Sequence, residues 1–180
     1  PDLLDTKALI QILRKLGVEV KEEKSTLLIK AAKLVSSHIP KDLMSKLRGS
    51  MVLSGAILGR MKKVSFHHPG GDIIGTRSIN THLEGFKSIG ATLKRNDLQY
   101  SLRLEEQGGP GGIFLNEASV TACENLILSS VLGKKRVVLK NCPKEPHVQD
   151  LCRMLLQMGA DIKGIGTDSL VIYGADKLSG

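Results

Sequence analysis

The chain has 180 residues, of which 41% are hydrophobic and 24% charged, with 26 lysines and arginines against 18 aspartates and glutamates. This composition indicates a folded globular protein and excludes disordered, collagen-like and disulfide-scaffold classes. The net charge of +8 favours anionic partners. The aromatic content of 3% argues against a surface on which single-stranded nucleic acid stacks.

The cellular compartment is predicted from features that the sequence lacks. No apolar run approaches the roughly 20 residues that span a bilayer. The first residues have neither the basic region nor the cleavage site of a signal peptide. Cys123, Cys142 and Cys152 show no metal-binding spacing and indicate reduced thiols. We therefore expect a cytoplasmic protein without a membrane segment.

One pattern occurs three times along the chain. Apolar residues at helical spacing lead to a glycine, and a short alternating run follows, which predicts a helix, a glycine C-cap and a strand. A second strand follows each copy. The copies are residues 9–20, 83–93 and 151–162, their glycines are Gly17, Gly90 and Gly159, and the second strands are 26–30, 99–104 and 169–173.

Two of the copies have an upstream half. It consists of a predicted helix (48–59 and 119–133), a strand (63–67 and 136–140) and a proline (Pro69 and Pro143). The repeated unit is therefore strand, helix, strand, helix, strand, strand, and the fold class is α/β (α+β). We predict one domain over 1–180, with a half unit at 1–30 and full units at 41–104 and 111–174. This spacing also predicts that the chain begins inside a unit.

The middle unit carries a short insertion that the other units lack, within residues 69–77. Gly70, Gly71 and Gly75 permit tight turns and close approach to a ligand. Arg77 and the start of the next helix, near Ser78, would form an anion site, and Asp72 would lie within it as an acid or base. The alternative is a plain glycine turn in which Asp72 caps the backbone and Arg77 faces solvent.

Other polar residues have structural and functional interpretations that the residues alone leave open. Arg48 precedes small residues at a helix start, where it either reaches a phosphate or faces solvent. Ser119 either caps its helix or joins a ligand site there. His67 and His68 are adjacent and could bind a metal ion, but no third ligand lies at suitable spacing, and His82 and His147 are isolated. We assign no metal ligand and expect no cofactor.

Several motifs resemble those of the UDP-N-acetylglucosamine 1-carboxyvinyltransferase family. They are PGGDIIGTRSINTH at 69–82, ASVTACEN at 118–125, EPHVQDLC at 145–152, and MGA at 158–160 with GIGTD at 164–168. The resemblance covers nearly the whole chain and corresponds to the family's first, catalytic-loop domain. It implies two similar domains of βαβαββ units with the active site between them, the second domain lying outside this sequence. It also implies transfer of an enolpyruvyl group from phosphoenolpyruvate to the 3-hydroxyl of UDP-N-acetylglucosamine, the first committed step of peptidoglycan synthesis.

The resemblance also implies roles for individual residues. Asp72, where most members have cysteine and some aspartate, is implied to protonate the methylene carbon of phosphoenolpyruvate. Arg77 is implied to contact the phosphates of both substrates, and Arg48 to bind the nucleotide sugar. Two stretches are implied to contact the nucleotide: Ser78, Ile79, Asn80 and Thr81, and Glu117, Ala118, Ser119 and Val120. An aspartate is common at position 80, and a lysine at position 117, where Glu117 reverses the charge.

Two other functions stay open at this stage. The first is a 3-phosphoshikimate 1-carboxyvinyltransferase-like domain with the same architecture and chemistry, against which the Pro-Gly-Gly-Asp loop argues. The second is a non-catalytic module that binds anions or nucleic acid, against which the low aromatic content and the lack of a basic run argue. For an enzyme, the expected partners are the two substrates and a second domain, in the same chain or a separate one, and we expect an isolated first domain to be weakly active or inactive.

Overall fold

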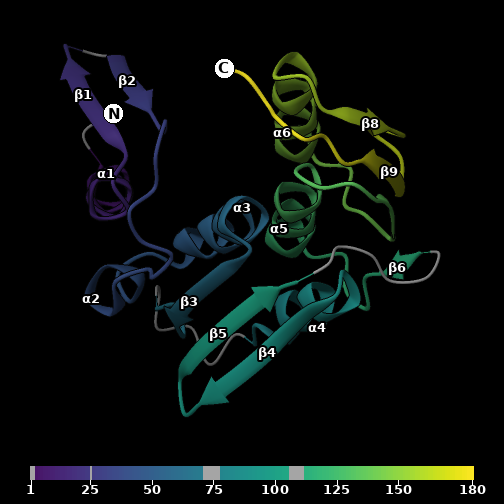
Figure 1. Cartoon of the computed structure of the whole chain (residues 1–180), viewed down its shortest axis with the longest axis horizontal. Coiled ribbons are helices and arrows are strands. Elements are labelled where there is room, and N and C mark those ends of the chain that lie inside the picture. The colour runs from purple at the N-terminus through teal and green to yellow at the C-terminus, as the bar shows by residue number, and fades with distance from the viewer. Residues whose placement is uncertain (1–2, 25, 71–77, 106–111) are drawn as a thin grey trace.

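Three helices lie side by side in the middle of the molecule, and two sheets lie outside them (Figure 1). They are α3 (Val52–Met61), α4 (Asn80–Ser88) and α5 (Val120–Ser130). The computed structural model describes residues 3–24, 26–70, 78–105 and 112–180. Within them, no helix is both long enough and apolar enough to cross a membrane.

The middle sheet has the order β3–β5–β4, and both of its strand pairs are antiparallel. Buried residues alternate with more exposed ones along β3 and β5, so that Phe66 and Tyr100 face the helices and stack at 5.5 Å between ring centroids. A parallel bridge from His38 to Ser65 adds the preceding segment to the β3 edge. The strands are β3 (Lys63–His67), β4 (Ala91–Asn96) and β5 (Gln99–Leu104).

The last sheet has the order β6–β7–β9–β8, with β6 parallel to β7 and the other pairs antiparallel. Helix α6 packs against α5 and β8. Its strands and helix are β6 (Ile113–Phe114), β7 (Arg136–Lys140), α6 (Pro146–Gln157), β8 (Asp161–Lys163) and β9 (Ser169–Tyr173).

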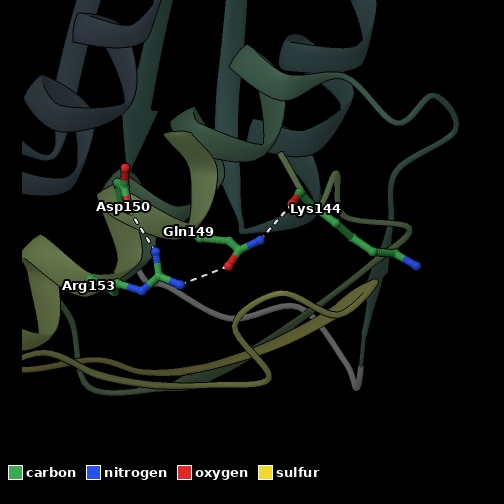
Figure 2. A network of polar contacts seen from close by, with 4 residues as sticks. All are labelled: Lys144, Gln149, Asp150 and Arg153. Atoms are coloured by element: carbon green, nitrogen blue, oxygen red, sulfur yellow. Dashed lines mark hydrogen bonds and ion pairs between the residues drawn. The ribbon is translucent and has the colours of Figure 1, made fainter. Parts of the chain in front are cut away.

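The start of α6 is held by a local polar network (Figure 2). Pro146 occupies its first turn, as the sequence predicts. Gln149 donates to the Lys144 carbonyl at 2.7 Å and accepts from Arg153 at 2.9 Å. Arg153 also pairs with Asp150 at 2.7 Å. The polar side chains of this helix start therefore bind one another and the preceding turn.

The N-terminal part is a helix and a hairpin, followed by two short turns of helix that lead into α3. All five residues of β2 are exposed, including Leu27, Leu28 and Ile29. Its elements are α1 (Leu4–Lys15), β1 (Glu19–Glu23), β2 (Thr26–Lys30), α2 (Lys41–Met44) and the 3₁₀ helix η1 (Arg48–Met51).

Most predicted elements are confirmed, and their bounds follow from local chemistry. The five strands predicted at 26–30, 63–67, 99–104, 136–140 and 169–173 have these bounds in the structure. Gly17, Gly90 and Gly159 have φ of 91°, 98° and 98°, the left-handed conformation of a glycine helix cap.

The helix predicted over 48–59 differs from the prediction at both ends. It begins as the 3₁₀ turn η1, and α3 continues past Gly59 to Met61. The left-handed residue that ends it is Lys62, at φ 59°. A Cβ on Gly59 would lie 2.7 Å from the Leu128 carbonyl oxygen, so this glycine allows α3 to approach α5 closely. The helix predicted over 119–133 ends earlier, at Ser130.

Candidate functional site

The central helices are parallel, so their N-terminal ends meet. Gly55 of α3 contacts Asn125 of α5, and one turn later Gly59 contacts Leu128 and Ser129. Likewise His82 of α4 contacts Thr121 and Asn125, and Gly85 contacts Leu126 one turn later. Because the contacts advance together along all three helices, their first turns lie at one end. Each helix N-terminus presents unpaired N–H groups and a partial positive charge, which favours an anionic ligand there.

Arg48 connects the first two of these ends. It lies at the start of η1, half-buried, and its Nη2 donates to the Ser78 carbonyl at 3.1 Å. Ser78 Oγ in turn accepts the backbone N–H of Asn80 at 3.0 Å, which satisfies the first N–H of α4. The side chain of Arg48 therefore lies beside the first turn of α4. An anion bound there would contact both the Arg48 guanidinium and the N–H groups of α4.

The second connection joins α4 to the segment before α5. Thr81 Oγ1 donates to Glu117 Oε2 at 3.2 Å. Ser119 Oγ accepts the Ala122 N–H at 3.4 Å, which confirms Ser119 as an N-cap. The structure thus brings together residues far apart in the sequence, from 48, 78–81 and 117–120, at the ends of three parallel helices.

A buried amide supports this arrangement from one turn below. Asn125 Oδ1 accepts the Gly55 N–H at 2.6 Å, and its Nδ2 donates to His82 Nδ1 at 2.9 Å. Since His82 Nδ1 accepts, its proton lies on Nε2, which is 3.4 Å from Thr121 Oγ1. Asn125 is fully buried and His82 is 5% exposed. One polar network therefore fixes the relative rotation of all three helices.

The same surroundings keep His82 neutral. Burial, with a smaller contribution from the positive charge of Arg48, lowers the pKa of His82 to about 4. A second ring proton would also point at the Asn125 amide group, which is itself a donor. His82 is therefore an uncharged acceptor at neutral pH.

Two of the predicted site residues, Asp72 and Arg77, lie outside the described residues. The loop that carries them is described up to Gly70 and again from Ser78. At Gly70 a Cβ would overlap the Ser45 carbonyl, so the insertion starts at a position that only glycine fits.

The other predicted residues differ in what they present to a ligand. The Ile79 side chain is 2% exposed and belongs to the core, so only its backbone is available to a ligand. Asn80 and Ala118 are exposed, whereas Val120 packs partly against the core. At the starts of α4 and α5, a ligand would therefore meet exposed polar side chains and backbone N–H groups.

Sequence reasoning missed the roles of His82 and Asn125, although both lie in the quoted motifs. The available signal was a polar residue next to Leu126 and Ile127, within a helix that is rich in apolar and small residues. That pattern indicates a buried amide but does not identify the partner helices.

All three cysteines are buried free thiols, and the pKa is raised for two of them, Cys123 and Cys152. Among the described residues no group of three histidine, cysteine or acidic side chains is placed to hold a metal ion. A hydrogen bond to Cys142, together with burial, raises the pKa of the Cys123 thiol, and burial raises the pKa of Cys152 to about 11. Both thiols therefore stay protonated at neutral pH.

Comparison with known proteins places this arrangement in a family. The family model described as EPSP synthase (3-phosphoshikimate 1-carboxyvinyltransferase) matches residues 1–180. A UDP-N-acetylglucosamine 1-carboxyvinyltransferase of Borreliella burgdorferi is 41% identical over 180 residues, and one of Treponema denticola is 38% identical over 181 residues. The chain spans 42% of the length of each of these relatives.

Solved structures of the same kind share the fold. The enolpyruvyl transferase NikO from Streptomyces tendae superposes with a TM-score of 0.81 over 99% of this chain and 42% of its own, at 21% identity. An EPSP synthase from Acinetobacter baumannii gives a TM-score of 0.68 over 97% of this chain and 40% of its own, at 20% identity. These likenesses confirm the α/β fold class. The chain therefore belongs to the EPSP synthase (3-phosphoshikimate 1-carboxyvinyltransferase) family.

Proposed function

We propose that this chain provides one half of a UDP-N-acetylglucosamine 1-carboxyvinyltransferase site. The observation that carries the proposal is the meeting of three helix N-termini around Arg48, Ser78 and Thr81. These are positions at which the family resemblance implies contacts to the nucleotide sugar. The names of the curated relatives at 38–41% identity support this acceptor.

The proposed reaction joins the 3-oxygen of the sugar to C2 of phosphoenolpyruvate and then breaks the bond from C2 to the phosphate oxygen. In the first step Asp72 donates a proton to the methylene carbon, and the 3-hydroxyl gives its own proton to a base. Loss of a proton from the methyl group so formed then restores the double bond as phosphate leaves, and Asp72 is reprotonated. Arg77, Arg48 and the helix ends hold the phosphate charges. The net charge of +8 attracts two anionic substrates.

In this proposal the rest of the cleft comes from the part of the relatives' length that this chain does not span, either in the same polypeptide or in a separate chain. The chain alone then binds the nucleotide sugar weakly and transfers little or no enolpyruvyl group, because positioning of both substrates supplies several kcal/mol of catalysis. The cytoplasm, where reduced thiols persist, is the proposed site of this step of peptidoglycan synthesis.

Calorimetric titration of the chain with UDP-N-acetylglucosamine tests the binding half of the proposal. We expect weak binding that Arg48→Gln reduces about tenfold or more, since a charge-assisted hydrogen bond contributes about 1.5–3 kcal/mol. Arg136→Gln, which removes an exposed arginine on β7, is the matched control. No binding at millimolar nucleotide sugar, or equal effects of the two substitutions, would contradict the site.

The catalytic half is tested with this chain joined to the remainder of a relative. Phosphate release from phosphoenolpyruvate should then require UDP-N-acetylglucosamine and should be lost in Asp72→Asn. Wild-type rates in that variant would remove Asp72 from the mechanism.

A second candidate acceptor is 3-phosphoshikimate, which the description of the matching family favours. Phosphate release that depends on 3-phosphoshikimate and not on the nucleotide sugar would establish it. Binding of generic RNA that weakens steeply with salt, without any response to the nucleotide sugar, would instead indicate a nucleic-acid-binding module.

A further inference from the structure

The outer face of the middle sheet, away from the central helices, is a polar surface with a hollow in it. Between the side chains of β3, β4 and β5 lies a cavity of about 460 Å³. Three cationic side chains line it, Lys63, Lys94 and Arg103, together with the hydroxyls of Ser65 and Ser101. None of these residues belongs to the candidate site at the helix ends.

Strand register places these side chains in two rows across the sheet. Lys63, Arg103 and Thr92 are direct neighbours in the first row, and Ser65, Ser101 and Lys94 in the second. Neighbouring side chains in such rows have Cβ atoms about 4.5–5.5 Å apart. The two rows therefore form one compact set of cationic and hydroxyl side chains on three strands. Thr92 Oγ1 already donates to the Arg103 carbonyl at 3.3 Å, and Ser65 Oγ lies 3.0 Å from His38 Nδ1.

The positive charge of this face is not compensated. Lys63 and Arg103, opposite each other on adjacent strands, are like charges, an arrangement that destabilises a sheet. Among the described residues neither they nor Lys94 form an ion pair with a carboxylate. Glu105 is the one carboxylate that the described lining contains. An anion between the rows would relieve the repulsion and accept hydrogen bonds from the cations and from the Ser101 hydroxyl.

Protection of a sheet edge explains only part of the pattern. A lysine on an edge strand discourages pairing with another chain, and this accounts for Lys94 on β4. Arg103 lies on the central strand β5, where both edges are already paired. Lys63 lies on the other edge strand, β3, where the same explanation applies, so edge protection leaves the central Arg103 unexplained.

We propose that this face binds a small phosphate-type anion, a phosphate or diphosphate group, between Lys63, Lys94 and Arg103. The two rows surround one hollow of about 460 Å³, which is large enough for one or two phosphate groups. An extended polyanion would need cations continuing along the strands, but the next row outward, His67, Gln99 and Asn96, has no lysine or arginine.

The test is a titration of the ¹⁵N-labelled chain with inorganic pyrophosphate at low ionic strength, followed by amide chemical shifts. We expect shifts at the amides of β3, β4 and β5 around the two rows. The double variant Lys63→Gln/Arg103→Gln should weaken this binding about tenfold or more. All three cations are exposed, so these substitutions should leave the fold intact.

Two controls separate this site from the one at the helix ends. Lys87→Gln removes an exposed lysine of α4 and should leave pyrophosphate binding at the sheet unchanged. Arg48→Gln should weaken nucleotide-sugar binding but leave the sheet shifts intact, so the two proposals succeed or fail separately. Unchanged sheet amides, or equal affinity in the double variant, would overturn the proposal. So would an RNA oligonucleotide that shifts the same amides and binds more tightly per phosphate than pyrophosphate.

Discussion

Asn125 Oδ1 accepts the backbone N–H of Gly55 at 2.6 Å across the contact between α5 and α3. Through its Nδ2 the same amide also reaches His82 on α4. The three helices whose first turns form the candidate site are thus joined by one fully buried side chain. The position of Arg48 relative to Ser78 depends on how these helices are rotated, and Asn125 fixes that rotation.

The first prediction concerns this amide. We expect Asn125→Ala to lower the free energy of unfolding by about 2–4 kcal/mol, because the Gly55 N–H loses its acceptor and a small cavity remains. Urea unfolding measures the change. Asn116→Ala removes an exposed asparagine whose amide donates to Glu84, and should cost less than about 0.5 kcal/mol. Equal losses of unfolding free energy in both variants would show that the hydrogen bonds of Asn125 do not stabilise the fold more than those of an exposed asparagine.

The second prediction concerns the closeness of α3 and α5. Alanine favours a helix over glycine by about 1 kcal/mol, but a Cβ at Gly55 would overlap the Asn125 carbonyl oxygen and lie 2.6 Å from Oδ1. The clash involves backbone and exceeds the gain, so Gly55→Ala should destabilise the chain by at least about 2 kcal/mol. Gly49→Ala is the matched control, since its Cβ would meet only Leu47 at 3.7 Å. A Gly55→Ala variant as stable as wild type would mean that the helices can separate freely.

The elements that sequence predicted well are those that local chemistry determines. Alternation of Val64 and Phe66 with polar neighbours defines β3, and Gly17, Gly90 and Gly159 end their helices because only glycine adopts that φ without strain. The contacts of Gly55 and Gly59 with α5 were not predictable in this way. They join residues about seventy positions apart, and the register of two packed helices leaves no local periodic signal.

The features of the candidate site likewise fall into those that the sequence predicted and those that only the packed structure defines. The resemblance located Arg48, Ser78 and Thr81, and the structure brings them together at the helix ends. It did not show that Ile79 turns its side chain into the core, nor that Glu117 is engaged by Thr81. Both depend on the orientation of a helix start relative to its neighbour, which only the packed structure defines.

The third prediction concerns pH. His82 has a pKa of about 4 in the folded chain, against the ordinary value of 6.5. Between these two pH values the unfolded chain is therefore protonated at His82, whereas the folded chain is not. The associated stability is fully present above about pH 6.5 and is lost as pH falls towards 4, by about 3 kcal/mol in total. Urea unfolding at several pH values should show this loss in wild type and not in His82→Gln, after subtraction of the acid dependence that both share.

A matched histidine variant completes this experiment. His147 is exposed at the start of α6, and His147→Gln should keep the wild-type dependence on pH. If His82→Gln followed the wild-type curve as well, His82 would not be the buried group that resists protonation.

The last prediction rests on the proposed function and concerns charge at the ligand. Glu117 places a carboxylate beside Thr81, at the helix ends where the diphosphate of a nucleotide sugar would bind. Glu117→Lys replaces repulsion with attraction, so affinity for UDP-N-acetylglucosamine should rise about three- to tenfold at low salt, a gain moderated by the exposure of the site. The gain should shrink as salt is added, because exposed charges are screened.

Glu19→Lys makes the same charge change on β1, away from the helix ends, and should have little effect on affinity. An unchanged or weaker affinity in Glu117→Lys would place the diphosphate elsewhere, whereas an equal gain in both variants would indicate general attraction by net charge.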